Sequence, residues 1–405
     1  MIRTRDRDAS APRLHARCMK RWYIPLRLLA VRLGSRIGSR FGIRDRVVLA
    51  TSHMARLNGN LAFIRAELAT RTPAIPVHVL AADVPRTRRA LLQGLARDVV
   101  AGYHLATARL FVVDDYFFPL YAARRRRGTT VVQVWHACGA FKKFGYSVLD
   151  KAFGKDGDFV RRMPIHTNYD LCLVSSTNAA PAYAEAFRQP LDRFTSALGI
   201  PRTDVFFLGE RTEHIAAEVR RQYAIPDGRR VILYAPTFRG DTIGRARSPD
   251  ELDLRLMQGV LGEDHVLLLR PHPFVSRRGA GDATLSGFVI DVSDHPDINE
   301  LMLASDVLVT DYSSAIYEFS LLERPMAFFA PDHVAYERER GFYFDYRTGL
   351  PGPIFETTEA LAGYLRAGVF DLERIARFRD ASFDVADGHA TARFVDEVVV
   401  PALRP

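Results

Sequence analysis

Polar side chains stand directly after an apolar run in the second half of the chain. The run ends in Asp311 and leads into Ser313 and Ser314, which open the helical pattern of residues 314–323. Backbone N–H groups at the start of a helix are unpaired, and with the helix dipole they attract anions such as phosphate. A serine at this position can instead cap the helix, so the pair alone leaves both interpretations open.

Two neighbouring apolar runs carry basic and polar side chains at equivalent positions. One run leads to Thr237 and Arg239, and the next ends in Arg270 and His272. Arginine binds phosphate oxygens through two parallel N–H groups, and backbone and imidazole donors add to such a site. Each of these residues is also compatible with a solvated strand end, but together with the serine pair they predict a pyrophosphate site.

A histidine ends a buried run in the first half. His136 follows Trp135, and Lys142 and Lys143 come shortly after it. Imidazole changes its charge near neutral pH, so a histidine at the edge of a sheet can accept a proton from a hydroxyl group as a general base. Beside a tryptophan, a purely structural histidine is the alternative.

Several other charged residues have simpler interpretations. Arg202 and Asp204 follow a Gly-Ile-Pro turn, where we expect a salt bridge or a helix cap. Asp294 or Asp297 is predicted to cap the next helix. Glu318 lies in the helix after the serine pair and either reaches a ribose hydroxyl or faces solvent.

Some kinds of site are absent from the sequence. Zinc-ligand spacings, a glycine-rich dinucleotide motif after a strand and a P-loop do not occur. The three cysteines, Cys18, Cys138 and Cys172, are too few and too scattered for a disulfide framework and indicate a reducing compartment. A nucleophilic role for Cys138 lacks an acid or base partner in the sequence.

The elements that position these residues alternate along the chain. Strands are expected at residues 46–52, 75–83, 109–115, 129–137, 169–176, 231–238, 265–273, 287–293, 306–311 and 325–331. Helical patterns lie between them, including one over residues 87–96 and a separate one over 101–108. Short apolar strands alternating with helices predict an α/β protein with two Rossmann-like, doubly wound parallel sheets. Such sheets bind ligands at the carboxyl ends of their strands.

The length of 405 residues suggests two domains. Glycine and proline near residue 205 mark the boundary between a domain at 45–204 and a second at 205–385. Residues 386–405 are expected to form a C-terminal helix that packs back on the first domain. The 48% hydrophobic and 25% charged content is that of a soluble globular protein.

The first 44 residues form a basic leader. The net charge of +9 and the pI of about 9.6 favour an anionic partner. Apolar residues recur at helical spacing and arginines lie on another side: Leu26, Leu29, Leu33, Ile37 and Phe41 against Arg32, Arg36 and Arg40. The pattern predicts a helix on an anionic membrane surface. Docking on the protein's own core and a partly disordered leader are the alternatives, while the arginines argue against a cleaved signal peptide.

Taken together, these motifs resemble the CDP-glycerol glycerophosphotransferase family. QVWHACGAFKKFGYS, GIPRTD, ILYAPTFRG, LRPHP and the segment around VTDYSS occur in the family's order over roughly residues 45–385. The resemblance implies a GT-B architecture, with two domains facing a central cleft. It also implies transfer of glycerol phosphate from CDP-glycerol to a hydroxyl of a lipid-linked acceptor, with release of CMP, in teichoic-acid-like polymer synthesis. The enzyme would be peripheral on the cytoplasmic face of the membrane.

The resemblance also implies roles for individual residues. His136 is the expected base, and His272 is expected to stabilise the leaving phosphate. The donor's phosphates and ribose would be held by Thr237, Arg239, Arg270, His272, Asp311, Ser313, Ser314 and Glu318. Lys142 and Lys143 would lie on the acceptor side. The scheme needs no protein-bound metal, although Mg²⁺ can accompany the pyrophosphate.

Two departures and several alternatives accompany this resemblance. Glu318 stands where many relatives have aspartate, and WHACG replaces a shorter Trp-His-Gly in some. A GT-B glycosyltransferase using a nucleotide sugar and a CDP-ribitol-dependent enzyme are the nearest alternatives. A non-catalytic relative and a membrane-binding or nucleic-acid-binding protein are further ones, although aromatics interleaved on a basic sheet face are not seen. The sequence does not separate a primase from a polymerase.

Overall fold

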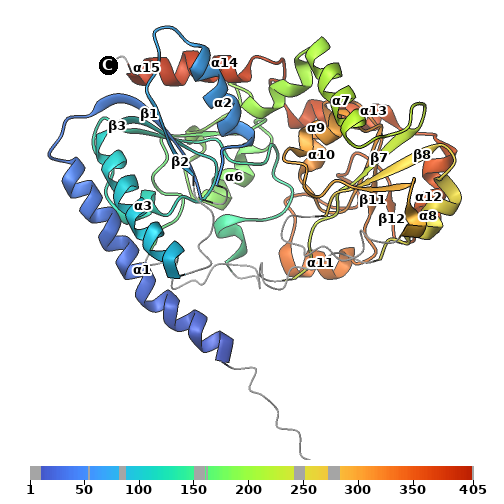
Figure 1. The fold of residues 1–405 in the computed structure, drawn as a ribbon, viewed down its shortest axis with the longest axis horizontal. Helices are drawn as coiled ribbons and strands as arrows, with labels where there is room; N and C mark the ends of the chain where they lie inside the picture. Colours follow the sequence, from blue (N-terminus) through green and yellow to red (C-terminus); the bar gives the residue numbers. More distant parts are fainter. Residues whose placement is uncertain are drawn as a thin grey trace, which may run out of the picture.

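Two parallel sheets organise the chain, and each forms the centre of one half of the molecule (Figure 1). The computed structural model describes residues 11–52, 55–81, 88–149, 160, 163–240, 251–271 and 283–403. Two halves of this kind, each with a six-stranded parallel sheet, make the two-domain GT-B-like fold that the resemblance implied.

The first sheet has the strand order β2-β1-β3-β4-β5-β6, and all neighbours are parallel. Its strands are β1 (Arg44–Thr51), β2 (Val77–Ala81), β3 (Ala108–Val113), β4 (Thr130–Gln133), β5 (Leu171–Leu173) and β6 (Phe194–Thr195). Its helices are α1 (Ala11–Gly38), α2 (Gly59–Thr70), α3 (Arg88–Thr107), α4 (Pro119–Ala122) and α6 (Ala180–Phe187).

Strand β1 shows why these strands read as continuous apolar runs. Val47 and Leu49 belong to the core on the α2 side, while Val48 and Ala50 belong to the core shared with α3. All four are 0% exposed. Because successive side chains point to opposite faces, a sheet covered on both faces needs apolar residues at every position.

Helices α1 and α3 pack against each other through glycines. A Cβ on Gly34 would lie 1.9 Å from the backbone oxygen of Val99, and one on Gly102 would lie 2.0 Å from that of Val31. The prediction of two helices in this part of the chain is therefore wrong, because α3 is continuous from Arg88 to Thr107. Gly94 and Gly102 both lie inside this helix, and Gly102 allows its close contact with α1.

The second sheet has the order β12-β11-β10-β7-β8-β9 and is also parallel throughout. Its strands are β7 (Arg230–Tyr234), β8 (His265–Leu269), β9 (Val289–Asp291), β10 (Val307–Thr310), β11 (Met326–Phe329) and β12 (Ile354–Phe355). Its helices include α7 (Glu210–Gln222), α8 (Leu254–Leu261), α9 (Ile298–Leu303), α10 (Ala315–Ser320), α11 (His333–Arg340), α12 (Thr358–Ala367) and α13 (Leu372–Ser382).

The chain returns to the first half at its C-terminal end. Helix α14 (Ala390–Phe394) packs against α2, and α15 (Val400–Leu403) contacts β3; both are red in Figure 1. Asp204, in the 3₁₀ helix Pro201–Phe207, caps α14 because its carboxylate accepts hydrogen bonds of 2.9 and 2.8 Å from the backbone N–H groups of Ala390 and Thr391. The cap expected for Asp204 is confirmed.

The leader helix packs on the first half, which was one of the alternatives for this segment, and it leaves an apolar row exposed. Val31 and the glycines of α1 face α3, while Leu26, Leu29, Leu33, Ile37 and Phe41 are 38–64% exposed. The exposed apolar row is therefore not the surface through which α1 packs against the rest of the protein. None of the described helices is long and apolar enough to cross a membrane.

Candidate active site

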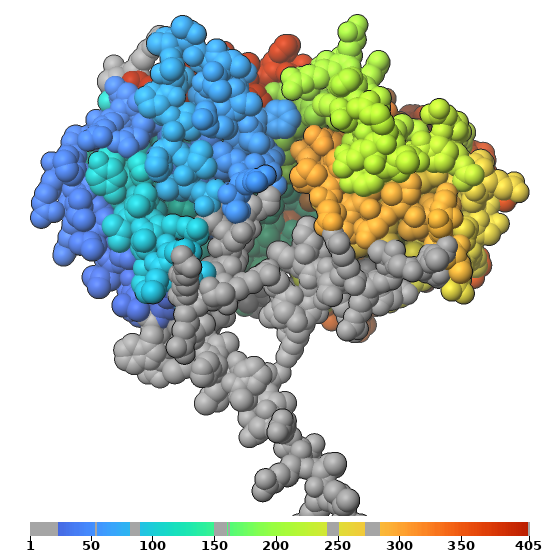
Figure 2. Space-filling model, viewed as in Figure 1, coloured from blue at the N-terminus to red at the C-terminus, as the bar shows by residue number. Residues whose placement is uncertain are grey.

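A cleft of about 770 Å³ lies between the carboxyl ends of the two sheets. In the space-filling view the two halves meet along a furrow between the blue and orange residues (Figure 2). The first half lines the cleft with Thr51, Asn58, Asn60, Asp114, Asp115 and His136. The second half lines it with Thr237, Arg270, Pro271, Asp297, Asn299 and Ser313. The place and volume are typical of ligand sites in open α/β folds.

His136 follows β4 and exposes its ring to this cleft. Its Nδ1 lies 3.0 Å from the backbone oxygen of Asp114. A carbonyl oxygen can only accept, so Nδ1 carries the proton and the lone pair of the neutral ring is on Nε2. The indole of Trp135 stacks on the imidazole with ring centroids 4.4 Å apart. The ring is held in an orientation in which Nε2 can accept a proton.

Asn60, at the start of α2, holds the chain just before His136. Its Nδ2 donates to the backbone oxygens of Val134 and Trp135, each at 2.9 Å, and its Oδ1 accepts from the N–H of Arg202 at 3.0 Å. Trp135 has a φ of 51°, which is uncommon for a residue other than glycine and needs such support. Sequence reasoning missed Asn60, whose only signal was a polar residue in the first turn of an apolar helix.

Arg202 connects the histidine loop to the second half. Its Nη1 donates to the backbone oxygen of His136 at 2.8 Å, and its Nη2 pairs with Oε1 of Glu318. Cys138 donates to the same carboxylate oxygen at 3.2 Å. The salt bridge expected for Arg202 is confirmed. Glu318 is 2% exposed and turned toward this junction, so the structure does not place it for contact with a ribose.

The thiol of Cys138 is fully buried in this junction. Burial raises the pKa of Cys138, and the nearby Arg202 opposes the shift. A thiol with a raised pKa carries little thiolate at neutral pH, which argues against a nucleophilic role.

A second titratable group lies beside His136. The carboxyl group of Asp114, at the end of β3, is 8% exposed, and its Oδ1 has no hydrogen-bond partner among the described residues. Burial raises the pKa of Asp114 to about 6, with opposing contributions from the Thr51 hydroxyl and from His136. Sequence reasoning assigned Asp114 only to the strand, because burial cannot be seen in the sequence.

The second half contributes a basic and two hydroxyl side chains. Arg270 follows β8 and donates from Nη1 to the backbone oxygens of Val292, at 3.1 Å, and Ser293. Burial lowers the pKa of Arg270. Thr237 and Ser313 line the cleft opposite the histidine, and Ser313 Oγ accepts from the N–H of Ala315 at 3.2 Å. These three side chains face the same cleft as His136.

Ser314, Lys142 and Lys143 do not line this cleft. Ser314 is the N-cap residue of α10, and its side chain makes no capping bond. The backbone of Lys142 bridges to Phe342, and the N–H of Lys143 donates to Gly341 at 3.0 Å, so both lysines stand at the junction with the second half. His272 lies outside the described residues.

Arg239 is enclosed by two carboxylates. Its Nε and Nη2 lie 2.6 and 2.9 Å from the oxygens of Asp332, and its Nη1 lies 2.8 Å from Asp311. The side chain is 12% exposed, and its guanidinium carbon lies 5.0 Å from the ring centroid of Tyr312. With its donors satisfied by two negative charges, Arg239 cross-links the loops after β7, β10 and β11. The geometry therefore does not support the expected phosphate contacts of Arg239 and Asp311.

Asp297, at the rim of the cleft, caps α9 by accepting from the N–H of Asn299 at 2.9 Å. One of the two caps offered by the sequence is thus confirmed. Among the described residues, no group of three or more histidine, cysteine or acidic side chains is arranged to hold a metal ion.

Comparison with known proteins gives a matching protein family and several relatives of this chain. A family model described as CDP-Glycerol:Poly(glycerophosphate) glycerophosphotransferase matches residues 39–400. The chain is 36% identical over 354 residues to a teichoic acid ribitol-phosphate primase from Bacillus spizizenii, covering 87% of this chain and 90% of that protein. It is 28% identical over 298 residues to a teichoic acid glycerol-phosphate primase from Bacillus subtilis, covering 74% and 75%.

Longer relatives and solved structures extend the comparison. The match spans only 56% of a teichoic acid poly(ribitol-phosphate) polymerase from Bacillus spizizenii, with 34% identity over 358 residues and 88% of this chain covered. A structure of the wall teichoic acid polymerase TagF superposes with a TM-score of 0.75 at 23% identity, covering 98% of this chain and 99% of that one. At this identity the superposition establishes the fold alone.

Proposed function

Because the chain belongs to the CDP-glycerol:poly(glycerophosphate) glycerophosphotransferase family, we propose that it transfers a polyol phosphate unit from a CDP-polyol to a hydroxyl of a membrane-linked acceptor. The observation that carries the proposal is the orientation of His136. Its Nδ1 is committed to the backbone oxygen of Asp114, which leaves Nε2 to accept a proton in the cleft. A hydroxyl group that loses its proton to Nε2 becomes the nucleophile.

The transfer itself forms one P–O bond and breaks another. The acceptor oxygen attacks the β-phosphorus of the CDP-polyol while its proton passes to His136. The bond between the β-phosphorus and the bridging oxygen breaks, and CMP leaves with that oxygen and the electron pair. Phosphoryl transfer gains most of its rate from positioning and charge stabilisation. We therefore expect the donor side of the cleft to position the pyrophosphate and to stabilise its charge.

We assign the donor's pyrophosphate to the side of the cleft formed by the second half. Arg270, Thr237 and Ser313 line it and offer a guanidinium and two hydroxyl groups. Ser314 adds a hydroxyl that makes no capping bond. His272, which follows the cleft residue Pro271, stays a prediction for the leaving phosphate. Arg239 is left out because its donors are already satisfied by Asp311 and Asp332.

The family description supports CDP-glycerol as the donor. The relatives named for ribitol phosphate, which include the primase at 36% identity, support CDP-ribitol as the alternative. Mg²⁺ accompanying the pyrophosphate is compatible with this scheme, and comparing rates with Mg²⁺ and with EDTA tests for it. A nucleotide-sugar glycosyltransferase is the second candidate, because the GT-B-like fold also occurs in enzymes that act on UDP-sugars.

We further propose that α1 places the enzyme on an anionic membrane, at its cytoplasmic face. The exposed row of Leu26, Leu29 and Leu33 supplies apolar surface, and Arg32 and Arg36 are exposed beside it. Such a helix lies in the interface with its apolar side in the lipid and its basic side near anionic head groups.

A donor panel tests the proposed reaction. The full chain is incubated with liposomes carrying a lipid-linked acceptor and with CDP-glycerol, CDP-ribitol or a set of UDP-sugars, and released CMP or UDP is measured. We expect CMP from one CDP-polyol, only when acceptor is present and not with His136→Asn. UDP release without CMP release would replace the proposal with a glycosyltransferase.

A further inference from the structure

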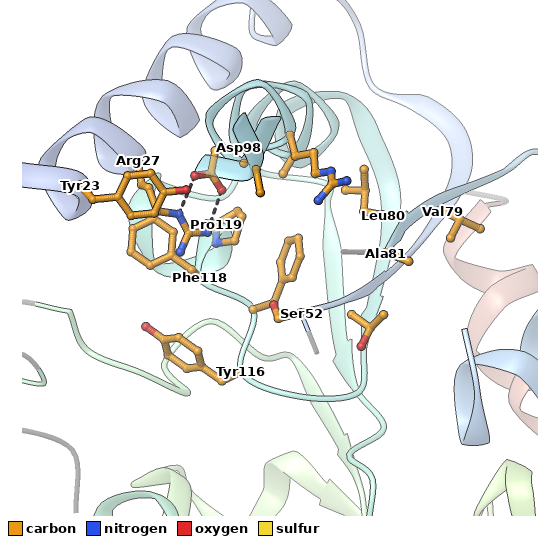
Figure 3. A pocket seen from close by; sticks show the side chains of 16 residues that line it. Tyr23, Arg27, Ser52, Val79, Leu80, Ala81, Asp98, Tyr116, Phe118 and Pro119 are labelled. Atoms are coloured by element: carbon orange, nitrogen blue, oxygen red, sulfur yellow. Dashed lines mark hydrogen bonds and ion pairs between the residues drawn. The ribbon is translucent and has the colours of Figure 1, made fainter. Parts of the chain in front are cut away.

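A second cavity, of about 420 Å³, lies in the first half beside the cleft (Figure 3). Tyr23 and Arg27 of α1 form one wall, and Val79, Leu80 and Ala81 of β2 form another. Helix α3 and the segment after β3 complete it with Ala90, Gly94, Ala101, Phe117, Phe118 and Pro119. The cavity has the size of a small-ligand site, and most of its lining is aliphatic or aromatic.

Arg27 and the buried Asp98, both in the lining of this cavity, form an ion pair. Arg27 Nε and Nη2 lie 2.7 and 2.9 Å from the two oxygens of Asp98, as the dashed lines in Figure 3 show. The guanidinium carbon of Arg27 also lies 4.0 Å from the ring centroid of Phe118. A bidentate pair against an aromatic ring has no net charge, so this wall of the cavity does not attract an ionic ligand. The lining therefore suits a hydrocarbon ligand, because the burial of apolar surface would be the main favourable contribution to the binding free energy.

The cavity lies between the exposed row of α1 and the cleft. Tyr23 and Arg27 reach it from the same helix that exposes Leu26 and Leu29 to solvent. Thr51 lines both the cavity and the cleft that holds His136. A lipid hydrocarbon chain that leaves a bilayer beside α1 would thus enter a pocket that borders the reaction site. Arg97, exposed and also part of the lining, can meet a phosphate attached to that chain.

We propose that this cavity binds the hydrocarbon chain of the lipid-linked acceptor and so positions the acceptor's head group for the cleft. The inference rests on the proposed function for the identity of the acceptor. The binding of a hydrocarbon chain in the cavity does not depend on the proposed function. Two hydrocarbon chemistries fit the lining, a linear acyl chain and a branched isoprenoid chain, and the test separates them.

Binding is measured by titration calorimetry on the full chain without membranes. The probes are dodecyl phosphate and farnesyl phosphate, with inorganic phosphate as the head-group control. Ala90→Phe fills the cavity, and Leu92→Phe is the matched control because Leu92 is 70% exposed on the same helix. We expect saturable binding of at least one chain, at least tenfold weaker in Ala90→Phe and unchanged in Leu92→Phe. No saturable binding by the wild type, or equal affinity in wild type and Ala90→Phe, would overturn the proposal.

A second filling variant guards against misfolding. Val79 is 40% exposed on β2, which is an edge strand, so Val79→Trp adds bulk to the cavity without displacing a fully buried residue. In CMP-release assays we expect both filling variants to raise KM for the lipid-linked acceptor with little change in kcat. If the wild type binds a chain but releases no CMP with any donor, the proposed reaction fails and the binding site stands. If CMP is released but filling leaves KM unchanged, the site fails and the reaction stands.

Discussion

Arg202 and Glu318 form an ion pair at the junction of the two halves, with side chains 16% and 2% exposed. The same guanidinium donates to the backbone oxygen of His136 at 2.8 Å. Glu318 belongs to α10, the helix that follows Ser313 and Ser314. One arginine therefore connects the loop that carries the proposed base with the helix beside the proposed donor site.

We expect Arg202→Met to lower the free energy of unfolding by about 3–5 kcal/mol, because it leaves the Glu318 carboxylate buried without its partner. Replacing both residues, as in Arg202→Met with Glu318→Leu, should recover much of the loss. Urea denaturation measures both variants. Arg377→Met is the control, since Arg377 pairs with Glu373 on the surface at 62% and 83% exposure. A loss no larger than that of the control, which should be below about 1 kcal/mol, would show that the pair contributes little.

His136→Asn should lower kcat for CMP release by about 10²–10⁴-fold, because the loss of a general base removes that much rate. Donor affinity should remain, since the donor side of the cleft belongs to the second half. Calorimetric titration with CDP-glycerol or CDP-ribitol measures that affinity. His214, which is exposed on α7, supplies the control His214→Asn. Unchanged turnover in His136→Asn would remove this histidine from the base role.

Arg239 and Arg270 should give opposite results when each is replaced by methionine. Arg270 lines the cleft, so Arg270→Met should raise KM for the CDP-polyol by about tenfold or more, the loss expected for a charged hydrogen bond to phosphate. Arg239 is paired with Asp311 and Asp332. Arg239→Met should therefore lower stability by about 3–5 kcal/mol, because the buried carboxylate of Asp311 and the partly buried carboxylate of Asp332 lose their partner. Steady-state kinetics and urea denaturation are run on both. A stable Arg239→Met with weakened donor binding would restore the original expectation for Arg239.

The strands could be predicted from the sequence because both sheets are covered on both faces. Val47 to Ala50 must all be apolar in such a strand, and this run is visible without a structure. The two-residue strands β6 and β12 give no comparable signal, and neither was predicted. The break expected within α3, between residues 96 and 101, does not occur, and Asp98 and Val99 of that stretch contact α1, a partner far away in sequence.

The site was predictable in part for the same reason. Four cleft residues follow strands within three positions, and the carboxyl ends of parallel strands meet at one edge; they are His136, Thr237, Arg270 and Ser313. The partner of a charged side chain is not visible in this way. Arg239 reads as an available phosphate ligand until Asp311 and Asp332, which lie 72 and 93 residues away, are placed beside it.

The exposed row of α1 gives a membrane prediction. Replacing Leu26, Leu29 and Leu33 by serine should reduce binding to anionic liposomes at least tenfold, since each exposed leucine adds about 1.5–3 kcal/mol when fully buried in lipid. Liposome sedimentation measures the bound fraction at low and high salt. Leu372, which is 48% exposed on α13, supplies the control Leu372→Ser. Wild-type binding by the triple variant would contradict a membrane role for the row.

Asp114 gives a prediction about stability and pH. Burial raises the pKa of Asp114 to about 6 in the folded chain, from an ordinary value of 3.8. Between these values the unfolded chain loses the proton while the folded chain keeps it. The stability that protonated Asp114 contributes is therefore complete below pH 3.8 and is lost as the pH rises through 6. At neutral pH the cost of the buried charge amounts to at most about 3 kcal/mol.

Asp114→Asn carries no charge at any of these pH values. Its free energy of unfolding, relative to wild type, should therefore rise between pH 4.5 and pH 7.5 by up to about 2 kcal/mol, because about 1 kcal/mol of the full difference is already lost at pH 4.5. Urea denaturation at the two pH values measures the difference. The exposed residue Asp227 provides the control Asp227→Asn, for which the difference from wild type should stay constant. A constant difference for Asp114→Asn as well would mean that this carboxyl group titrates alike in the folded and unfolded chain, and that it does not change charge beside His136 near neutral pH.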